Sequence, residues 1–397
     1  MSGELRDLMW PANTSGTIPK RFAATCRYRA FIPNRLEEIE LALDGEAVGA
    51  VSEAEHAIRD LNSTNHVALG PLARLLLRTE SIASSKIEGM QVDVTRLARA
   101  EARTTIAQKV GPEAERLLAN VQAMQLAVEA AATASPVTVH EIEAIHHRLM
   151  TGDPNYHTAG VVRRVQNWIG GNDYNPCGAA FVPPPPEHVS PLLADLCGYL
   201  NLETESPLVQ AAISHAQFET IHPFTDGNGR TGRALIHVIL RHRGIAKTFV
   251  PPISLVFASG KDRYIEGLTQ FRGSEVTAWI SYFAAATTRA ARLAQRYVAD
   301  VEKLQATWRE QLRAHRALRA DSAAWLIIDL LPAHPIVTAA AIIAATNRDK
   351  SGVSRALDEL CAAGVLRPPA ESKRNQLFEA PALLELIEQI EDGRLEE

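Results

Sequence analysis

Residues 222–233 read "HPFTDGNGRTGR" and place a histidine, an aspartate, three glycines, an asparagine and two arginines in twelve positions. Gly227 and Gly229 let the backbone take positive φ angles, so that consecutive amides can converge on an anion. A helix that begins in this stretch turns its free N-terminal amides and the positive end of its dipole toward the same anion. The stretch therefore predicts a phosphate-binding turn at the start of a helix.

The charged residues of this stretch indicate more than one phosphate. Arg230 and Arg233 are three positions apart, so both side chains can reach one side of the helix. Two permanently charged, forked cations favour a di- or triphosphate over a single phosphate. Asp226 beside them would be repelled by phosphate unless a cation lies between, which predicts Mg²⁺. His222 is the group that can move a proton near neutral pH.

The common glycine-rich nucleotide motifs do not fit this stretch. There is no GxxxxGK[ST] sequence, and the segment before the stretch has the pattern of a helix rather than of a strand. A turn that merely joins two helices is the simplest alternative. The histidine, the aspartate and the two arginines stand where a phosphate site would use them, which favours the functional interpretation.

The stretch resembles the signature HPFxDGNGRxxR of the Fic family at every defined position. The resemblance extends over roughly residues 110–300, because "FETIHPF" and "RALIHVIL" are similar to the helix pair of that family and "GVVRRVQNWIGG" to its flap hairpin. It implies an enzyme that moves AMP from ATP to a hydroxyl of a target protein.

The same resemblance implies a role for each residue of the motif. His222 would be the general base that deprotonates the target hydroxyl, and Asp226 would hold Mg²⁺ at the α- and β-phosphates. Arg230 would bind the β-phosphate and Arg233 the γ-phosphate. The anion hole would be formed by Gly227, Asn228 and Gly229.

The resemblance also implies a docking segment for the target. The flap of such proteins pairs with the target backbone as an added strand. Its residues here would be Val165, Gln166, Asn167, Trp168 and Ile169. Tyr264 is a further candidate, for lining an adenine pocket by analogy with the family. His215, on the helix before the motif, is interpreted as a packed core histidine.

A second stretch, "SSKIEG" at residues 84–89, is similar to the inhibitory motif [S/T]xxxE[G/N] of the self-inhibited Fic class. Ser84 and Glu88 lie four positions apart, so they share one face of a helix over about residues 80–90. The resemblance implies that Glu88 pairs with Arg233 and occupies the cation meant for the γ-phosphate. Without the resemblance, the pattern would indicate only a solvated helix end.

The rest of the chain is predicted to be mostly helical. Apolar residues recur at three- and four-residue spacing, as in residues 113–131. "TVHE" at 138–141 is a capping-box pattern and predicts a helix that ends near Met150. Further helices are expected over 207–221, from the motif to Gly244, and over 276–318.

Two regions depart from this pattern. Residues 160–185 carry β-branched and aromatic residues around "GGND" and predict a short hairpin. Residues 322–380 predict helix, turn, helix and a two-stranded wing, the order of a winged helix-turn-helix domain. Basic residues barely outnumber acidic ones in 336–380, which favours protein recognition or dimerisation over DNA binding.

We therefore expect a mostly α fold: a Fic-type helical core with a short β-hairpin flap, followed by a C-terminal winged helix-turn-helix domain. The expected parts are an N-terminal helical region (1–109) with the inhibitory helix, a Fic catalytic domain (110–300), a linker helix (301–320) and the winged helix-turn-helix domain (321–397).

The composition of the chain argues against several classes of protein, such as general nucleic-acid-binding and membrane-spanning proteins. The 397 residues carry a formal net charge of −5, which argues against a generally basic nucleic-acid-binding surface. No apolar run is long enough to predict a membrane span. The cysteines show no metal-binding spacing, and neither structural zinc nor a disulfide framework is expected. The four cysteines are Cys26, Cys177, Cys197 and Cys361. Because the N-terminus also lacks a signal-peptide pattern, a cytoplasmic location is predicted.

Three functions remain open. The first is a protein adenylyltransferase restrained by Glu88, with ATP, Mg²⁺ and an unidentified target protein as partners. The second uses the same site to remove AMP or to transfer another phosphate-containing group. The third is a DNA-binding regulator that senses nucleotide, and the intact His222 argues against it because a sensor needs no base. A homodimer is plausible for the family.

Overall fold

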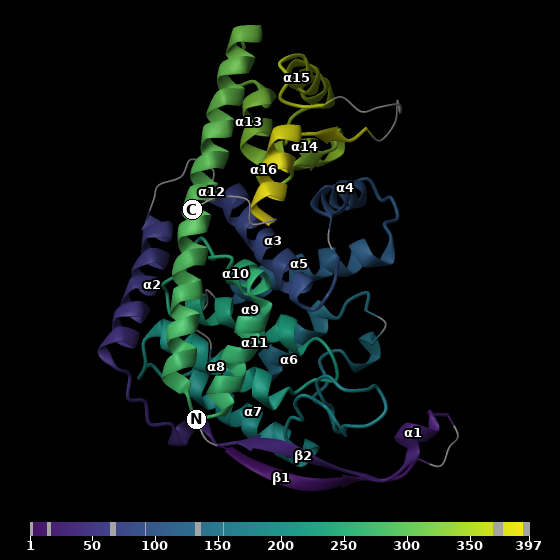
Figure 1. Ribbon diagram of the computed structural model, residues 1–397. Helices are drawn as coiled ribbons and strands as arrows, with labels where there is room; N and C mark the ends of the chain where they lie inside the picture. The colour runs from purple at the N-terminus through teal and green to yellow at the C-terminus, as the bar shows by residue number, and fades with distance from the viewer. Residues whose placement is uncertain are drawn as a thin grey trace. The chain divides into compact units, whose positions relative to one another are not determined.

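The computed structural model describes residues 3–13, 17–63, 69–91, 93–131, 136–153, 155–367 and 376–391. The chain forms two units that alternate along the sequence. The first unit contains residues 1–55, 127–244 and 261–285, and the second contains residues 56–126, 245–260 and 286–397. Three long helices continue from one unit into the other along the chain: α2 (Gly45–Ser63), α5 (Pro112–Ala130) and α12 (Val276–His315) (Figure 1).

Two buried helices form the centre of the first unit. They are α8 (Pro207–Ile221) and α9 (Asn228–His242), and the sequence predicts both. The helices pack closely at Gly232, where a Cβ atom would lie 2.5 Å from Glu219 Oε1 and 2.9 Å from Phe218 Cδ1. A larger residue at this position would push the helices apart, so the glycine sets their separation.

Three helices pack around this pair: α6 (Val139–Leu149), α7 (Pro186–Leu200) and α11 (Lys261–Arg272). The predicted capping box at the start of α6 is confirmed, because the Thr138 hydroxyl accepts from the Glu141 amide and the Glu141 carboxylate accepts from the Thr138 amide. Trp279, near the start of α12, is fully buried and donates its indole N–H to the Ala212 carbonyl of α8 at 2.8 Å.

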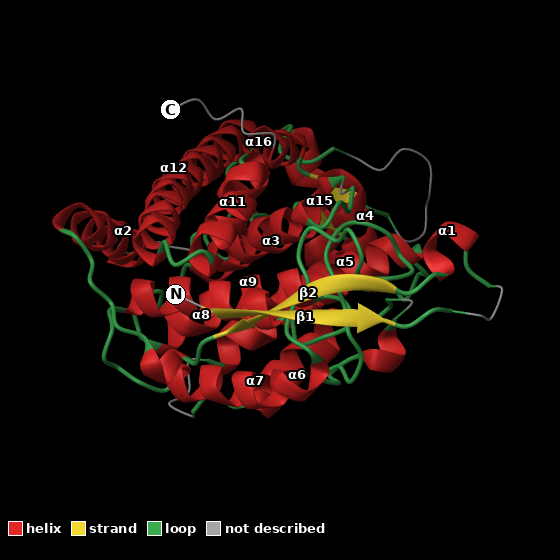
Figure 2. Cartoon of the chain, turned by 60° about the horizontal axis from the view of Figure 1, so that its bottom comes forward, coloured by secondary structure: helices red, strands yellow, loops and turns green. Residues whose placement is uncertain are grey.

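The N-terminal residues form a β-hairpin instead of the helices expected there. β1 (Gly3–Trp10) pairs antiparallel with β2 (Cys26–Pro33), and the short helix α1 (Lys20–Ala23) lies between them (Figure 2). A single 3-10 turn (Leu36–Glu38) separates the hairpin from α2. The strand signal is the alternation of polar and apolar residues in "CRYRA", which has a period of two.

The second unit contains the helix that carries the predicted inhibitory residues, α3 (Leu69–Ile87). It packs against α10 (Ile253–Ser259), and α4 (Val94–Thr104) follows it in the chain. The buried Glu80 carboxylate of α3 accepts hydrogen bonds from the Ser254 amide at 2.8 Å and from the Ser254 hydroxyl. These bonds satisfy the oxygens of a buried carboxyl group and fix α3 to α10.

The C-terminal part of the second unit contains the three helices expected in residues 322–380, but of the expected two-stranded wing the described residues form only a bridge between Arg367 and Glu379. Its elements are α13 (Ala323–Leu330), β3 (Ile336–Val337), α14 (Ala339–Thr346), α15 (Lys350–Ala362), β4 (Phe378–Glu379) and α16 (Pro381–Glu391). β4 pairs antiparallel with β3, and Glu379 also bridges Arg367. The predicted wing loop, 368–375, lies outside the described residues. The sequence did not indicate β3 or α16.

These C-terminal elements share one apolar core with α3. The core contains Leu72 and Leu76 of α3, Val301 of α12, Leu357 of α15 and Leu383 of α16. Ion pairs lie at its edge, where Lys86 Nζ is 2.9 Å from Glu391 Oε2 and Arg99 Nε is 2.6 Å from Glu379 Oε1. The inhibitory helix and the C-terminal helices are therefore parts of the same packed body. None of the described helices is both long and apolar enough to cross a membrane.

Candidate active site

His222 ends α8 in a left-handed backbone conformation, with φ 50° and ψ 60°. This conformation costs a non-glycine residue about 1–2 kcal/mol, so the surroundings must impose it. The His222 amide donates to the Phe218 carbonyl at 2.9 Å, and the imidazole Nδ1 lies 3.4 Å from the Glu219 carbonyl oxygen. The side chain remains 17% exposed, so that a substrate can reach it.

The turn after His222 is closed by Asn228. Its side chain accepts from the Phe224 amide at 2.8 Å and donates to the Phe224 carbonyl at 2.8 Å. Gly227 takes φ +73°, and a Cβ atom there would lie 2.8 Å from the Met150 sulfur. The predicted turn is therefore present at the start of α9, and both the backbone angle and the lack of space require glycine at position 227. The positive φ angle expected at Gly229 is wrong, because Gly229 lies inside α9.

A histidine on α6, His146, supports this turn. Its ring stacks on Phe224 with centroids 3.7 Å apart and planes 2° from parallel. Nδ1 accepts from the Gly160 amide at 2.8 Å, so Nε2 carries the proton and donates to the Asp226 carbonyl at 2.9 Å. Burial lowers the pKa of His146 to about 4, which keeps this neutral form. The only sequence signal for His146 is its position on the apolar face of α6, which does not indicate a role in the site.

Asp226 and Arg230 are held by the loop that follows α6. Asn155 Nδ2 donates to Asp226 Oδ2 at 3.1 Å, and the Gly227 amide donates to Asp226 Oδ1 at 2.6 Å. Asp153 Oδ2 lies 3.8 Å from Arg230 Nη2, and both side chains are largely buried. The sequence pattern does not mark Asp153 or Asn155, because their role depends on the packing of α6 against α9.

The carboxylate of Asp226 fits the predicted magnesium ion as one ligand of several. No group of three or more His, Cys, Asp or Glu side chains that could hold a metal occurs among the residues that the structure describes. A metal at Asp226 would therefore take phosphate oxygens and water as its other ligands, which is how Mg²⁺ is commonly bound beside nucleotides.

Arg233 and His215 lie deeper in the same unit. Arg233 is 1% exposed, and its charge adds to burial in lowering the pKa of His215 to about 3. His215 Nε2 lies 2.8 Å from the Tyr264 hydroxyl, and its ring stacks on Trp279. His215 is thus a core histidine, as predicted. Tyr264 is 3% exposed within this aromatic cluster, and its adenine-pocket role stays a prediction.

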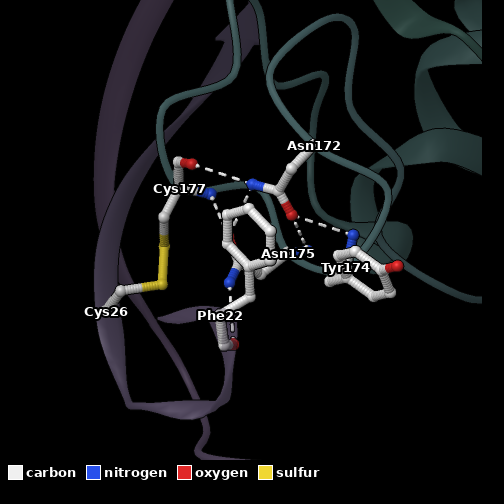
Figure 3. Close-up of a disulfide and its surroundings, with 6 residues drawn as sticks. All are labelled: Phe22, Cys26, Asn172, Tyr174, Asn175 and Cys177. Carbon is white, nitrogen blue, oxygen red and sulfur yellow. Dashed lines mark hydrogen bonds between the residues drawn. A yellow bond between two sulfur atoms is a disulfide. The ribbon is translucent and has the colours of Figure 1, made fainter. Parts of the chain in front are cut away.

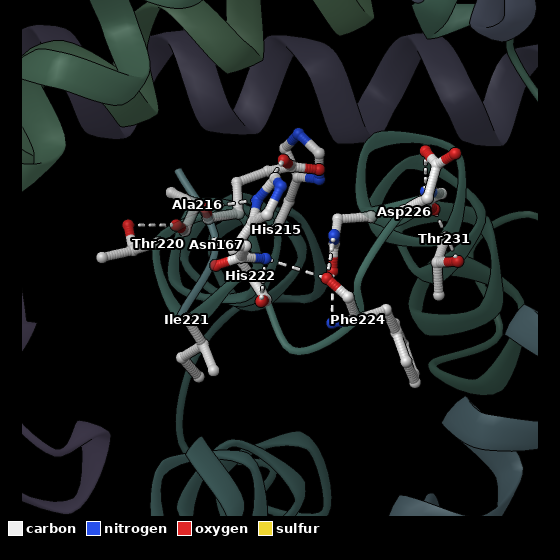
Figure 4. Close-up of polar contacts among 12 residues, drawn as sticks. Asn167, His215, Ala216, Thr220, Ile221, His222, Phe224, Asp226 and Thr231 are labelled. Atoms are coloured by element: carbon white, nitrogen blue, oxygen red, sulfur yellow. Dashed lines mark hydrogen bonds and ion pairs between the residues drawn. The ribbon is translucent and has the colours of Figure 1, made fainter. Parts of the chain in front are cut away.

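The predicted flap residues divide by the direction of their side chains. Val165 and Ile169 are 61% and 38% exposed. Asn167 points the other way and donates to the carbonyls of His222 and Phe224 (Figure 4). Gln166 donates to the Pro183 carbonyl, and the Trp168 indole to the Asn172 carbonyl. The expected hairpin is reduced to one β-bridge, between Ile169 and Phe181.

A disulfide between Cys26 and Cys177 joins β2 to the loop of the flap (Figure 3). No disulfide framework was expected from the sequence, and this pair overturns that expectation, whereas Cys197 and Cys361 are free. Asn175 Nδ2 also donates to the Phe22 carbonyl at 3.0 Å, and Phe22 stacks on Tyr174 with centroids 5.3 Å apart. The two cysteines are 151 positions apart, so their pairing depends on the tertiary fold and leaves no spacing pattern in the sequence.

Reduction of this disulfide is expected to lower the free energy of unfolding by about 2–4 kcal/mol, because a cross-link between distant residues restricts the unfolded chain. Urea unfolding with and without dithiothreitol, followed by tryptophan fluorescence, measures the difference. A Cys26→Ser/Cys177→Ser protein should unfold like the reduced wild type and ignore dithiothreitol. Identical unfolding of oxidised and reduced wild type would contradict the prediction.

The predicted inhibitory residues belong to the second unit. Ser84 lies in the last turn of α3 and is 3% exposed. The helix ends at Ile87, so Glu88 lies in the turn that follows and is exposed. Gly89 closes this turn with φ +82° and donates its amide to the Lys86 carbonyl at 2.9 Å.

Comparison with known proteins agrees with this geometry. Residues 136–240 match the family described as Fic/DOC, and residues 48–129 match the one described as Fic/DOC family N-terminal. The chain is 34% identical over 118 residues to protein adenylyltransferase fic-1 of Caenorhabditis briggsae, covering 29% of this chain and 21% of the relative. It is 32% identical over 156 residues to protein adenylyltransferase Fic of Nematostella vectensis, covering 38% and 33%.

The chain thus spans between about a fifth and a third of the length of these curated relatives. Among solved structures, a Fic family protein from Desulfovibrio desulfuricans G20 has the same fold, with a TM-score of 0.50 and 21% identity. That match covers 86% of this chain and 97% of the other. Residues 48–129 and 136–240 are therefore similar to the N-terminal domain and to the Fic domain of the Fic/DOC family.

Proposed function

We propose that this protein is an adenylyltransferase that moves AMP from ATP to a hydroxyl side chain of a target protein. The observation that carries the proposal is the placement of the complete motif. His222 precedes the glycine turn, and Arg230 and Arg233 lie buried at the start of the helix that the turn begins. The adenylyltransferase relatives support the same activity.

In the proposed reaction, His222 accepts the proton of the target hydroxyl while the hydroxyl oxygen attacks the α-phosphorus of ATP. The bond from this phosphorus to the oxygen that bridges to the β-phosphate breaks, and pyrophosphate leaves with the negative charge. A histidine suits this step because its pKa ordinarily lies near neutral pH. Its fixed backbone also supports the in-line geometry that the attack requires.

The two arginines are assigned to stabilise the negative charge on the leaving pyrophosphate. Arg230 would bind the β-phosphate and Arg233 the γ-phosphate. Their exposed fractions are 6% and 1%, so both cations are held before substrate arrives and need little reorganisation. The amides of Gly227, Asn228 and Gly229 would bind the same anion. Asp226 would hold Mg²⁺, which when bound neutralises phosphate charge.

We further propose that Glu88 restrains this activity by pairing with Arg233. The support is the motif at residues 84–89 and its position at the end of α3. A glutamate on Arg233 competes with the γ-phosphate, whose correct binding directs the α-phosphate toward the target hydroxyl. The wild type is therefore proposed to be largely silent.

The test of the proposed function uses the Glu88→Gly protein with ATP labelled on either the α- or the γ-phosphate, in a bacterial lysate with Mg²⁺. Label from the α-phosphate should remain covalently bound to protein, and label from the γ-phosphate should appear in pyrophosphate. Protein labelled only from the γ-phosphate would show phosphate transfer instead. Absence of any labelling, with AMP released from a modified protein, would favour the reverse reaction.

For residues 321–397 we propose a winged helix-turn-helix module that recognises protein or forms a homodimer. The order of α13, β3, α14, α15 and β4 supports this assignment. DNA binding is the weaker alternative, because basic residues barely outnumber acidic ones in residues 336–380. Light scattering of the full chain tests for a dimer, and a gel-shift assay with duplex DNA tests the alternative.

A cytoplasmic location is proposed for the protein. The Cys26–Cys177 disulfide argues in the other direction, since disulfides seldom persist in a reducing cytosol. Mass spectrometry of the protein isolated after rapid thiol trapping shows whether Cys26 and Cys177 are free thiols or a disulfide in the cell. Trapped thiols at both cysteines would support the proposed location, and an intact disulfide would contradict it.

A further inference from the structure

Four consecutive carbonyl oxygens around the proposed base accept hydrogen bonds from two residues of the flap. These are the carbonyls of Ile221, His222, Pro223 and Phe224. Arg163 supplies the bonds to the first three, and Asn167 bonds the second and the fourth. The backbone carbonyls of all four residues from 221 to 224 therefore accept hydrogen bonds from the flap.

Arg163 is the centre of this arrangement. Its Nε donates to the His222 carbonyl at 2.8 Å, and its backbone amide donates to the Pro223 carbonyl at 2.9 Å. The rest of the guanidinium bonds the flap itself, since Nη1 donates to the Val165 carbonyl at 3.0 Å and Nη2 to the Pro184 carbonyl at 2.7 Å. One side chain thus joins both sides of the flap to the residue proposed as base.

The position of Arg163 has a physical reason. The last carbonyls of a helix have no intrahelical partner, and they form the negative end of the helix dipole. A guanidinium offers five donors in a rigid plane, so it can bond several of these oxygens at once. Burial lowers the pKa of Arg163 to about 10, which still leaves it charged at neutral pH. It is 3% exposed, out of reach of a target or nucleotide in solution.

We propose that Arg163 is a positioning residue for His222, and that Arg163 and Asn167 make the flap and the loop 221–224 move as one body. The inference rests on the proposed adenylyl transfer, and it assigns a new task to the flap. A target strand that docks on the outer side chains Val165 and Ile169 lies against the same segment that fixes the base. Docking of the hydroxyl and placement of its proton acceptor are thereby coupled.

The chain supplies its own matched control, because Arg163 is followed by the exposed Arg164. Hydrogen exchange of full-length Arg163→Lys and Arg164→Lys proteins is followed by mass spectrometry. The guanidinium bonds the carbonyls of Ile221 and His222 and, in the flap, those of Val165 and Pro184. A lysine cannot bond all of these at once, so Arg163→Lys should speed exchange about tenfold or more in 163–169 and in 222–228 together. Arg164→Lys should leave both segments as in the wild type.

Kinetics on the Glu88→Gly background give the second measurement. Arg163→Lys is expected to lower kcat about 10–100-fold, with the KM for ATP within about twofold, because the base is displaced while the phosphate site is kept. Should Arg163→Lys not fold, Asn167→Ala removes only the bonds to the His222 and Phe224 carbonyls and should show the same pattern more weakly.

Two outcomes separate the inference from the proposed function. If exchange rises in 163–169 while 222–228 stays at the wild-type rate, the loop holds itself and the inference is wrong. If both segments loosen together but the Glu88→Gly parent transfers no label, the coupling stands and the proposed adenylyl transfer fails.

Discussion

Replacement of His222 by alanine in the Glu88→Gly protein is expected to lower AMP transfer about 10²–10⁴-fold, the usual contribution of a positioned general base. Without the imidazole, the attacking hydroxyl keeps its proton until water removes it. The binding of ATP should change little, because the phosphates are assigned to the turn and to Arg230 and Arg233. The rate is measured with α-labelled ATP and the affinity by calorimetry.

His215→Ala is not a suitable control for this change, since His215 packs between Tyr264 and Trp279 in the core. His147→Ala is better matched, because His147 is an exposed histidine of α6. It should keep nearly all of the activity. Equal transfer by the His222→Ala and parent proteins would remove the general-base assignment and with it the proposed reaction.

Replacement of Glu88 by glycine in the wild type is expected to raise AMP transfer about 10- to 150-fold, the equivalent of removing one charge-assisted hydrogen bond of about 1.5–3 kcal/mol. The reason is release of Arg233 for the γ-phosphate. The gain should appear in labelling at saturating ATP, because correct placement of the phosphates governs the attack as well as the affinity.

Two variants show whether charge or backbone freedom causes the gain. Glu88→Gln keeps the size of the side chain and removes its charge, so it should also activate the protein. Glu113→Gly makes the same substitution at an exposed glutamate in the first turn of α5 and should have no effect. Activation by glycine but not by glutamine would show that loosening of the turn, not an ion pair, restrains the enzyme.

Features set by neighbouring residues could be predicted from the sequence. The capping box of α6, the extents of α8 and α12 and the glycine turn before α9 each depend on contacts within a few positions. The roles predicted for the motif depend on local sequence in the same way, because its histidine, aspartate, two arginines and glycines occupy twelve adjacent positions.

Features that depend on packing between distant segments could not be predicted from the sequence. His146 is an ordinary apolar-face histidine until α6 packs against Phe224. Arg163 is one of two adjacent arginines until the fold brings it to three carbonyls 58 to 60 positions away that accept its hydrogen bonds. Cys26 and Cys177 carry no mutual spacing signal, and the N-terminal hairpin has a strand pattern too short to outweigh the helical composition around it.

The apolar core that α3 shares with α13, α15 and α16 decides how this protein can be dissected in the laboratory. A fragment ending near residue 320, where the sequence suggests a boundary, would lack Leu357 and Leu383 and expose part of the core to which α3 also belongs. Exposed apolar surface of this kind favours aggregation. Expression of the catalytic part alone is therefore best attempted with the C-terminal helices retained.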